Sequence, residues 1–172
     1  MTKIHFDNIL ECENMVYGAI LDKGEKYYTH LSKVFKAIGN QQTKFNWLIT
    51  ACECYPKTKS IEELFLRDYC WLSGTELTKL VDFEDIQWIW AVLSGFNKDI
   101  PLAKILEYPL PYADGYGGFW KNPLSIQHPL ASIEIVPWDS SLTLMISEEK
   151  GIVECFMKSF PLSEDLSMYI TK

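Results

Sequence analysis

The sequence lacks most of the signatures that would identify a reaction. It has only three histidines, His5, His30 and His128, and no two stand four residues apart, as a zinc-binding helix requires. It contains no G-x-S-x-G nucleophile motif. Gly115-Tyr-Gly-Gly118 has neither the lysine nor the following helix of a phosphate-binding loop. We therefore expect no catalytic residue, no metal and no cofactor.

Long apolar runs and basic stripes are also missing. No stretch approaches the roughly 20 apolar residues of a transmembrane helix, and charge interrupts the apolar positions of residues 1–13, unlike in a signal peptide. The net charge is −7, and lysine and arginine form no run that would neutralise phosphates. We expect no membrane or nucleic-acid partner. An acidic surface favours a basic protein partner, although such a charge also serves solubility.

The cysteines are odd in number and lie mostly in apolar segments, at Cys12, Cys52, Cys54, Cys70 and Cys155. This usage is typical of reduced thiols and predicts a cytoplasmic protein. Cys52 and Cys54 are too close together for a zinc knuckle, and no second pair completes four ligands. In a strand they share one face, so we expect them to pack in the core beside Trp47 and Ile49.

What is present predicts a single α+β domain over residues 1–172. The length suits one domain, and 48% of the residues are hydrophobic. Apolar spacing predicts a helix from 27 to 38, another at 150–160 and a last helical turn in 163–170. Strands are expected at 44–55, 69–72, 132–136 and 141–146. We expect a mixed or antiparallel sheet with short helices packed on it.

Several local features refine this scheme. Ser60 and Ser73 each stand three residues before a glutamate, which predicts two capping boxes at helix starts. Residues 86–93 fit a buried helix or a strand, and their aromatic and β-branched content favours the strand. The strands at 132–136 and 141–146 alternate apolar and polar residues, which predicts a hairpin with one solvent-facing side.

The most informative segment runs from Tyr108 to Trp120. Its prolines and glycines exclude regular structure, yet it carries five large aromatic residues. Such a loop is typical of recognition, because tyrosine and tryptophan dominate the centres of protein interfaces. We expect the loop aromatics and Trp138 of the hairpin turn to converge. The predicted partner-binding residues are Tyr112, Asp114, Tyr116, Phe119, Trp120, His128, Trp138 and Asp139, with Glu84 and Asp85 as a second, acidic patch.

Three apolar patterns support a family resemblance over residues 44–160. They are Phe45-Asn-Trp-Leu-Ile49, Trp88-Ile-Trp-Ala-Val-Leu93 and Ile133-Glu-Ile-Val-Pro-Trp-Asp-Ser-Ser141. With the acidic charge, they resemble small α+β families of Gram-positive bacteria that are similar to immunity proteins of polymorphic toxin systems. The resemblance implies a non-enzymatic inhibitor that covers a partner protein, such as a basic toxin or effector, with an acidic aromatic surface. It carries over no catalytic residue.

Other interpretations remain open. The 108–128 loop could close over a nucleotide-like ligand, or serve a modest enzyme in which His128 is a general base oriented by Asp114 or Asp139. The aromatic residues could instead form a self-contact in an oligomer. The oligomeric state is not predicted.

Overall fold

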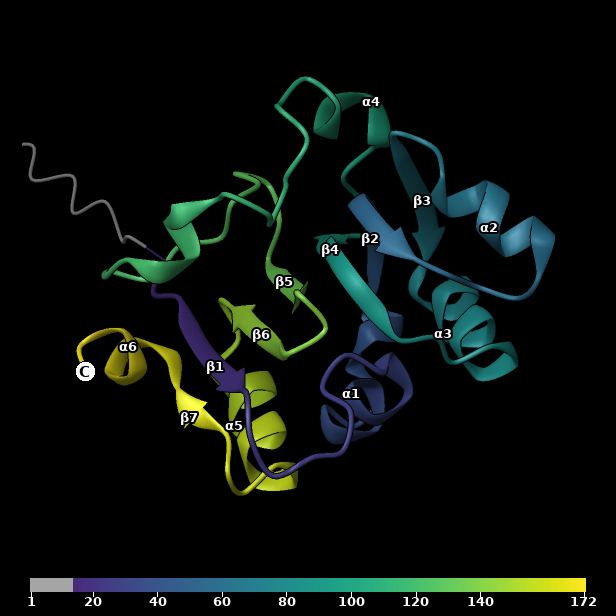
Figure 1. The fold of residues 1–172 in the computed structure, drawn as a ribbon. Helices are drawn as coiled ribbons and strands as arrows, with labels where there is room; N and C mark the ends of the chain where they lie inside the picture. Colours follow the sequence, from purple (N-terminus) through teal and green to yellow (C-terminus); the bar gives the residue numbers. More distant parts are fainter. Residues whose placement is uncertain (1–13) are drawn as a thin grey trace, which may run out of the picture.

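A computed structural model describes residues 14–172 and places seven antiparallel strands in one sheet (Figure 1). The strand order is β3-β2-β4-β5-β6-β1-β7, and every neighbouring pair is antiparallel. The predicted α+β class is confirmed, with an antiparallel sheet.

The strands are β1 (Tyr17–Leu21), β2 (Phe45–Cys54), β3 (Tyr69–Ser73), β4 (Trp88–Asn97), β5 (Ile133–Trp138), β6 (Leu142–Ser147) and β7 (Glu164–Asp165). The α-helices are α1 (Leu31–Ala37), α2 (Lys59–Phe65), α3 (Gly74–Phe83), α4 (Leu102–Ile105), α5 (Lys150–Ser159) and α6 (Leu166–Ile170). Two 3₁₀ helices complete the list, η1 (Gln41–Lys44) and η2 (Gly117–Trp120).

Most of the predicted elements are present. The strand interpretation of 86–93 is confirmed by β4, and the strands at 44–55, 69–72, 132–136 and 141–146 appear as β2, β3, β5 and β6. The first helix begins later than predicted, at Leu31. Sequence analysis missed β1, which pairs with β6. Ala19, Ile20 and Leu21 are all buried, so β1 shows no alternation that would reveal a strand.

One predicted capping box is confirmed and the other is wrong. At the start of α3, the Ser73 hydroxyl accepts from the Glu76 amide and the Glu76 carboxylate accepts from the Ser73 amide. Helix α2 instead begins at Lys59 with Thr58 as its N-cap, and no side chain of its own caps it. The carboxylate of Glu84 accepts hydrogen bonds from backbone amides just before this helix, so a distant residue replaces the local cap.

Helices cover one face of the sheet. Helices α1, α2, α3 and α5 bury their apolar faces against strand residues such as Trp47, Leu93 and Met145 in the largest hydrophobic cluster. Trp47 and Trp88 are fully buried there. Burying a large side chain of this kind contributes roughly 1.5–3 kcal/mol, so this layer supplies most of the stabilising apolar area.

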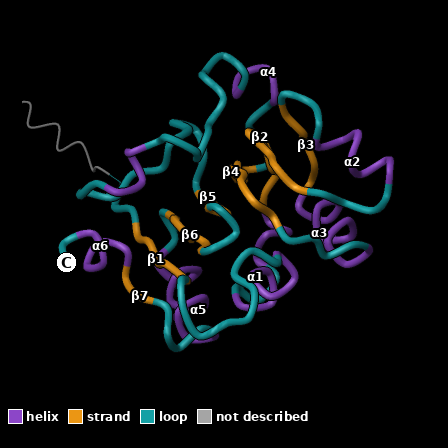
Figure 2. Tube along the Cα trace, in the orientation of Figure 1, coloured by secondary structure: helices purple, strands orange, loops and turns teal. Residues whose placement is uncertain are grey.

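The other face is covered mainly by an irregular stretch, residues 100–131, which we call the covering segment. It contains α4 and η2 and is otherwise loop (Figure 2). It packs Phe119 and Ala113 against Val92, Val136 and Leu144 of the sheet.

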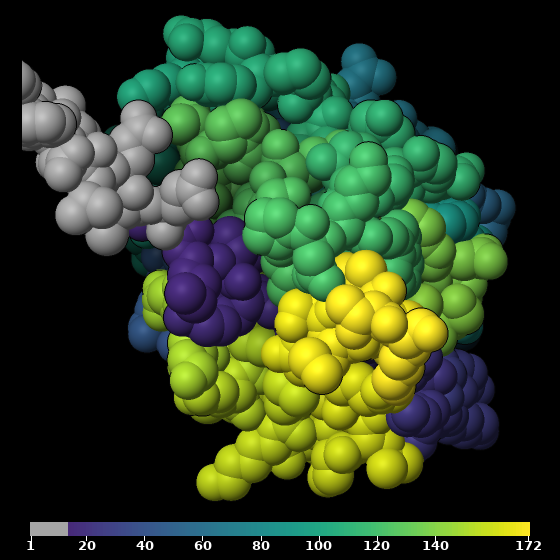
Figure 3. Space-filling model, turned by 90° about the vertical axis from the view of Figure 1, so that its left-hand side faces the viewer, coloured from purple at the N-terminus to yellow at the C-terminus, as the bar shows by residue number. Residues whose placement is uncertain are grey.

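The covering segment lies beside the C-terminal α6 (Figure 3). The side-chain amide of Asn122 donates to the carbonyl of Ser167 at 2.9 Å. Since both faces of the sheet are covered, the predicted solvent-facing side of the β5–β6 hairpin is wrong. Glu134, Thr143 and Ser147 are fully buried.

A pair of glycine substitutions tests this packing. A Cβ added at Gly74 would stand 2.1 Å from the carbonyl oxygen of Gln42, whereas a Cβ at Gly151 meets nothing within 4 Å. We expect Gly74→Ala to lower the free energy of unfolding by about 2 kcal/mol or more, because the contact is with backbone. Gly151→Ala should raise it by about 0.5–1 kcal/mol, because alanine favours the helix. Urea denaturation measures both, and equal effects would contradict this packing.

Candidate functional site

Three half-buried indoles form a continuous contact on the second face of the sheet. The ring of Trp138, at the end of β5, lies 5.0 Å from that of Trp90 on β4 and 5.1 Å from that of Trp120 in η2. Both contacts are edge-to-face, a favoured geometry for aromatic pairs. We call Trp90, Trp120 and Trp138 the tryptophan strip. The expected convergence of the loop with the hairpin turn is thus confirmed for Trp120 and Trp138.

A second aromatic series stays within the covering segment. Tyr116 contacts Tyr112 at 5.4 Å and Phe119 at 4.8 Å between ring centroids. A Cβ added at Gly118 would clash with the end of the Tyr116 ring, so a larger residue there would displace this side chain. Tyr112 is exposed, Tyr116 is half-buried and Phe119 is buried. This series therefore mainly packs the segment onto the sheet and leaves Tyr112 at the surface.

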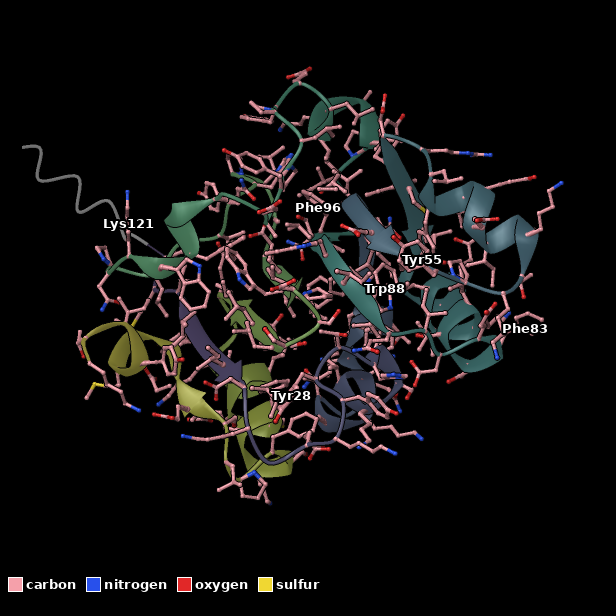
Figure 4. All side chains as sticks on the ribbon, in the orientation of Figure 1. Tyr28, Tyr55, Phe83, Trp88, Phe96 and Lys121 are labelled. Carbon is pink, nitrogen blue, oxygen red and sulfur yellow. The ribbon has the colours of Figure 1, made fainter. Side chains whose placement is uncertain are left out.

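An acidic groove of about 480 Å³ lies at the end of the sheet where β4 begins. Its lining consists of Tyr55, Lys57, Glu84, Asp85, Ile86, Gln87, Ile89 and Ser140. Tyr55 is 75% exposed, and Phe83, the last residue of α3 and the neighbour of Glu84, is 74% exposed at the outer edge of the molecule (Figure 4).

The groove and the tryptophan strip meet at the β5–β6 turn. The amide of Ser140 donates to the carbonyl of Ile89 at 3.0 Å, so the turn is held beside the residue that precedes Trp90. The Ser141 amide donates to the Trp138 carbonyl at 3.0 Å, and the central residues of this turn, Asp139 and Ser140, both have positive φ, 49° and 57°. Asp139 is exposed next to Trp138. The two patches that the sequence left apart are therefore neighbours.

The two carboxylates of the groove also hold local structure. Glu84 accepts from the backbone amides of Lys57 and Thr58, which lowers its pKa. Asp85 accepts from the hydroxyl and the amide of Ser32, and one of its oxygens lies 3.4 Å from Nδ1 of His30. Both carboxylates remain partly exposed. They can attract a cation while staying in fixed positions.

Two predicted contact residues are not at the surface. Phe119 and His128 are each only 1% exposed, so the expectation that they touch a partner is wrong. The His128 ring packs against Phe96 and Tyr108. The covering segment closes over the sheet and buries both side chains, which a sequence pattern of aromatics among glycines does not reveal.

The geometry of His128 also contradicts the general-base interpretation. Its Nε2 lies 3.1 Å from the carbonyl of Ile105, and its Nδ1 accepts from the amide of Leu130 at 3.1 Å. Burial lowers its pKa. Asp114 and Asp139 are both exposed and are not its partners. The imidazole is therefore a structural linker.

Sequence analysis missed Glu134, the one glutamate of the described residues that is completely buried. Its carboxylate accepts from the Ser94 hydroxyl at 3.0 Å, the Gln127 amide at 2.7 Å and the His128 amide at 3.0 Å. Burial raises its pKa from 4.5 to about 7, and the three donors oppose this rise. The residue fastens the end of the covering segment to β4 and β5. Its alternating strand position resembled a solvent-facing one, so no local signal pointed to it.

The part of the chain that the structure describes has neither a metal-binding cluster nor a membrane-spanning helix. Across residues 14–172, no group of three or more His, Cys, Asp or Glu side chains could hold a metal ion. No helix in this range is both long and apolar enough to span a bilayer.

The pKa of Glu134 predicts a pH dependence of stability. Because the folded-state pKa lies above the unfolded one, the folded protein retains this proton longer. The resulting stability is fully present below about pH 4.5 and is lost as pH rises through about 7. We expect the wild-type unfolding free energy, relative to Glu134→Gln, to fall by about 3 kcal/mol from pH 4.5 to 8.

Urea denaturation of both proteins across this pH range makes the measurement. Glu149→Gln removes an exposed glutamate and is the control, which should keep the wild-type profile. Parallel profiles for wild type and Glu134→Gln would contradict the assignment.

Comparison with known proteins gives a family but no relative of known activity. No curated protein and no solved structure matches the chain. A family described as "Protein of unknown function (DUF2691)" matches residues 17–109, from β1 to just beyond α4. This stretch includes Glu84, Asp85 and Trp90, while Trp120 and Trp138 lie outside it. Because the match covers more than half of the 172 residues, the chain belongs to the DUF2691 family.

Proposed function

We propose that this protein is a non-enzymatic binding protein that covers part of a basic partner protein with the tryptophan strip and the acidic groove. The observation that carries the proposal is their meeting at one turn, between Trp138 and Ser140. Together they offer half-buried indoles beside partly exposed carboxylates. This is the composition of an interface with an aromatic centre and a charged rim.

The physical arrangement suits tight association. Trp138 already contacts both Trp90 and Trp120, so less side-chain freedom is lost on binding. Glu84 and Asp85 are held by hydrogen bonds to backbone amides, so their charges keep their positions. A net charge of −7 attracts a cationic partner and raises its association rate. Tyr55 and Phe83 extend the exposed apolar area at the groove.

The partner in this proposal is a basic toxin or effector enzyme that the protein inhibits, in keeping with the resemblance to immunity proteins. We place the complex in the cytoplasm. The free thiols of Cys52, Cys54, Cys70 and Cys155 are consistent with a reducing compartment. The predicted contacts that remain at the surface are Tyr112, Asp114, Tyr116, Trp120, Trp138, Asp139, Glu84 and Asp85.

A second candidate is a small-molecule binding protein. A cavity of about 550 Å³ lies along residues 123–131, lined by Leu124, Ile126 and Pro129 among others. Its size falls within the range of ligand pockets, roughly 300–1,000 Å³. A nucleotide or similar compound that co-purifies with the protein, or raises its melting temperature, would favour this candidate over a protein partner.

Quantitative capture from the native cell extract tests the first proposal. We expect wild type to retain a basic protein in stoichiometric amount. The double variants Trp120→Ala/Trp138→Ala and Glu84→Gln/Asp85→Asn should lose it. With the purified pair, the tryptophan variant should bind about 30-fold more weakly, the effect of losing one interface hot spot. The charge variant should mainly slow association at low salt.

The control removes two negative charges, as the charge variant does, but at a distance from the groove. Asp99 and Glu107 are exposed and come after the last residue of β4, whereas the groove lies where β4 begins. Asp99→Asn/Glu107→Gln should therefore bind like wild type. Circular dichroism and melting temperature establish that each variant is folded. Unchanged affinity in both site variants would refute this binding surface.

A further inference from the structure

Two thiols face each other at the end of β2. The Sγ atoms of Cys52 and Cys54 are 3.5 Å apart, and both side chains are half-buried. They pack against the edge of the main core, as the sequence predicted, but they do not reach its interior. No other feature of the site described above uses them.

The backbone around this pair is irregular. Ala51 has a φ of 47°, in the left-handed region, and the pairing of β2 with β4 shifts register between Thr50 and Glu53 and again before Cys54. The pairing of β2 with β3 ends at Thr50. Residues 51–54 therefore lack a complete ladder on either side, and such bulges re-aim side chains. The bulge leaves this stretch freer to adjust than a central strand.

The thiols also open to solvent. They line a pocket of about 260 Å³ together with Glu53, Tyr55, Glu62, Phe65 and Leu66. Tyr55 and Leu66 are 75% and 77% exposed, so the mouth of the pocket is at the surface. A small reagent can reach this pair. By contrast, Cys70 is buried, and burial raises its pKa to about 11.

The two thiols differ in their acidity. A hydrogen bond from the Cys52 thiol lowers the pKa of Cys54, while the same bond and burial raise the pKa of Cys52. Cys54 is therefore the better thiolate and Cys52 holds its proton. Reactive dithiols divide their roles in this way, with one attacking sulfur and one resolving sulfur.

We propose that Cys52 and Cys54 form a redox-active dithiol that exchanges with small disulfides, such as oxidised glutathione, to give a reversible intramolecular disulfide. The Cys54 thiolate attacks one sulfur of the glutathione disulfide, breaks its S–S bond and forms a mixed disulfide. The first glutathione leaves as a thiolate and takes up a proton. Cys52 then loses its proton and attacks the Cys54 sulfur, and the second glutathione leaves. Two protein thiols are oxidised by two electrons, and one glutathione disulfide is reduced to two thiols.

The geometry favours an easily reversed bond. The sulfurs must approach from 3.5 Å to about 2.05 Å, a shift that the bulged backbone can absorb. A disulfide that closes only three residues restricts the unfolded chain little, so it adds little stability. Exposed disulfides of this kind have more oxidising potentials than structural ones. Because Tyr55 lines both this pocket and the acidic groove, oxidation would occur beside the proposed binding surface.

Peptide mass spectrometry after differential alkylation tests the proposal on the full chain. In neutral glutathione buffers of increasing oxidised fraction, we expect the peptide that contains residues 52 and 54 to lose two hydrogens, and dithiothreitol to restore both thiols. Cys52→Ser and Cys54→Ser should each accumulate a glutathione adduct instead. Cys70→Ser should still form the disulfide, and Cys155, which is exposed and distant in sequence, should carry only an adduct.

A rate measurement separates this role from mere exposure. Iodoacetamide at neutral pH should modify Cys54 faster than Cys70. Cys52→Ala should slow the modification of Cys54 several-fold, because the hydrogen-bond donor is removed, while Cys52→Ser should retain more of the rate. The proposal is overturned if oxidised glutathione leaves both thiols alkylatable, joins Cys52 to Cys70, or leaves two glutathione adducts on the pair.

Discussion

The buried carboxylate of Glu134 is the interaction on which the second face of the molecule depends. It accepts hydrogen bonds from Ser94 of β4 and from the amides of Gln127 and His128 at the end of the covering segment. An unpaired carboxylate in this position would cost several kcal/mol, so the three donors and the acceptor require one another. His128 extends the same anchor, because its ring links the carbonyl of Ile105 to the amide of Leu130. A segment with almost no regular structure is thereby held against a sheet.

This anchoring divides the aromatic residues of the covering segment into two groups. Phe119 turns inward and joins Val92, Val136 and Leu144 in a small core. Trp120 stays half-buried against Trp138, and Trp138 in turn contacts Trp90. The indoles then meet the acidic groove at the β5–β6 turn. The proposed binding surface is therefore a product of how the segment is fastened, and not of the loop composition alone.

Local patterns were sufficient wherever a local interaction decided the structure. β2, β4 and β5 carry dense apolar and β-branched residues, and Ser73 with Glu76 caps α3 within four residues. Prediction failed where a distant group intervened. Glu84 accepts from the amides of Lys57 and Thr58, and α2 begins at Lys59, so Ser60 lies inside the helix and not at its N-cap. The alternation of β5 suggested a solvent-facing side, because nothing in six residues indicates that residues 100–131 fold over it.

The sequence by itself determined the class of the fold, most of the strands, the closing helix and the absence of a recognisable catalytic motif. These properties follow from residue type and short-range periodicity. Only the tertiary structure decided that the sheet is covered on both faces, that His128 and Phe119 are buried, and that Glu84 and Asp85 lie beside the turn that carries Trp138. It also brought the sulfurs of Cys52 and Cys54 to 3.5 Å from each other, at a β-bulge that the residue types of this strand do not predict. Such arrangements depend on contacts between segments far apart in the chain, which a linear pattern does not encode.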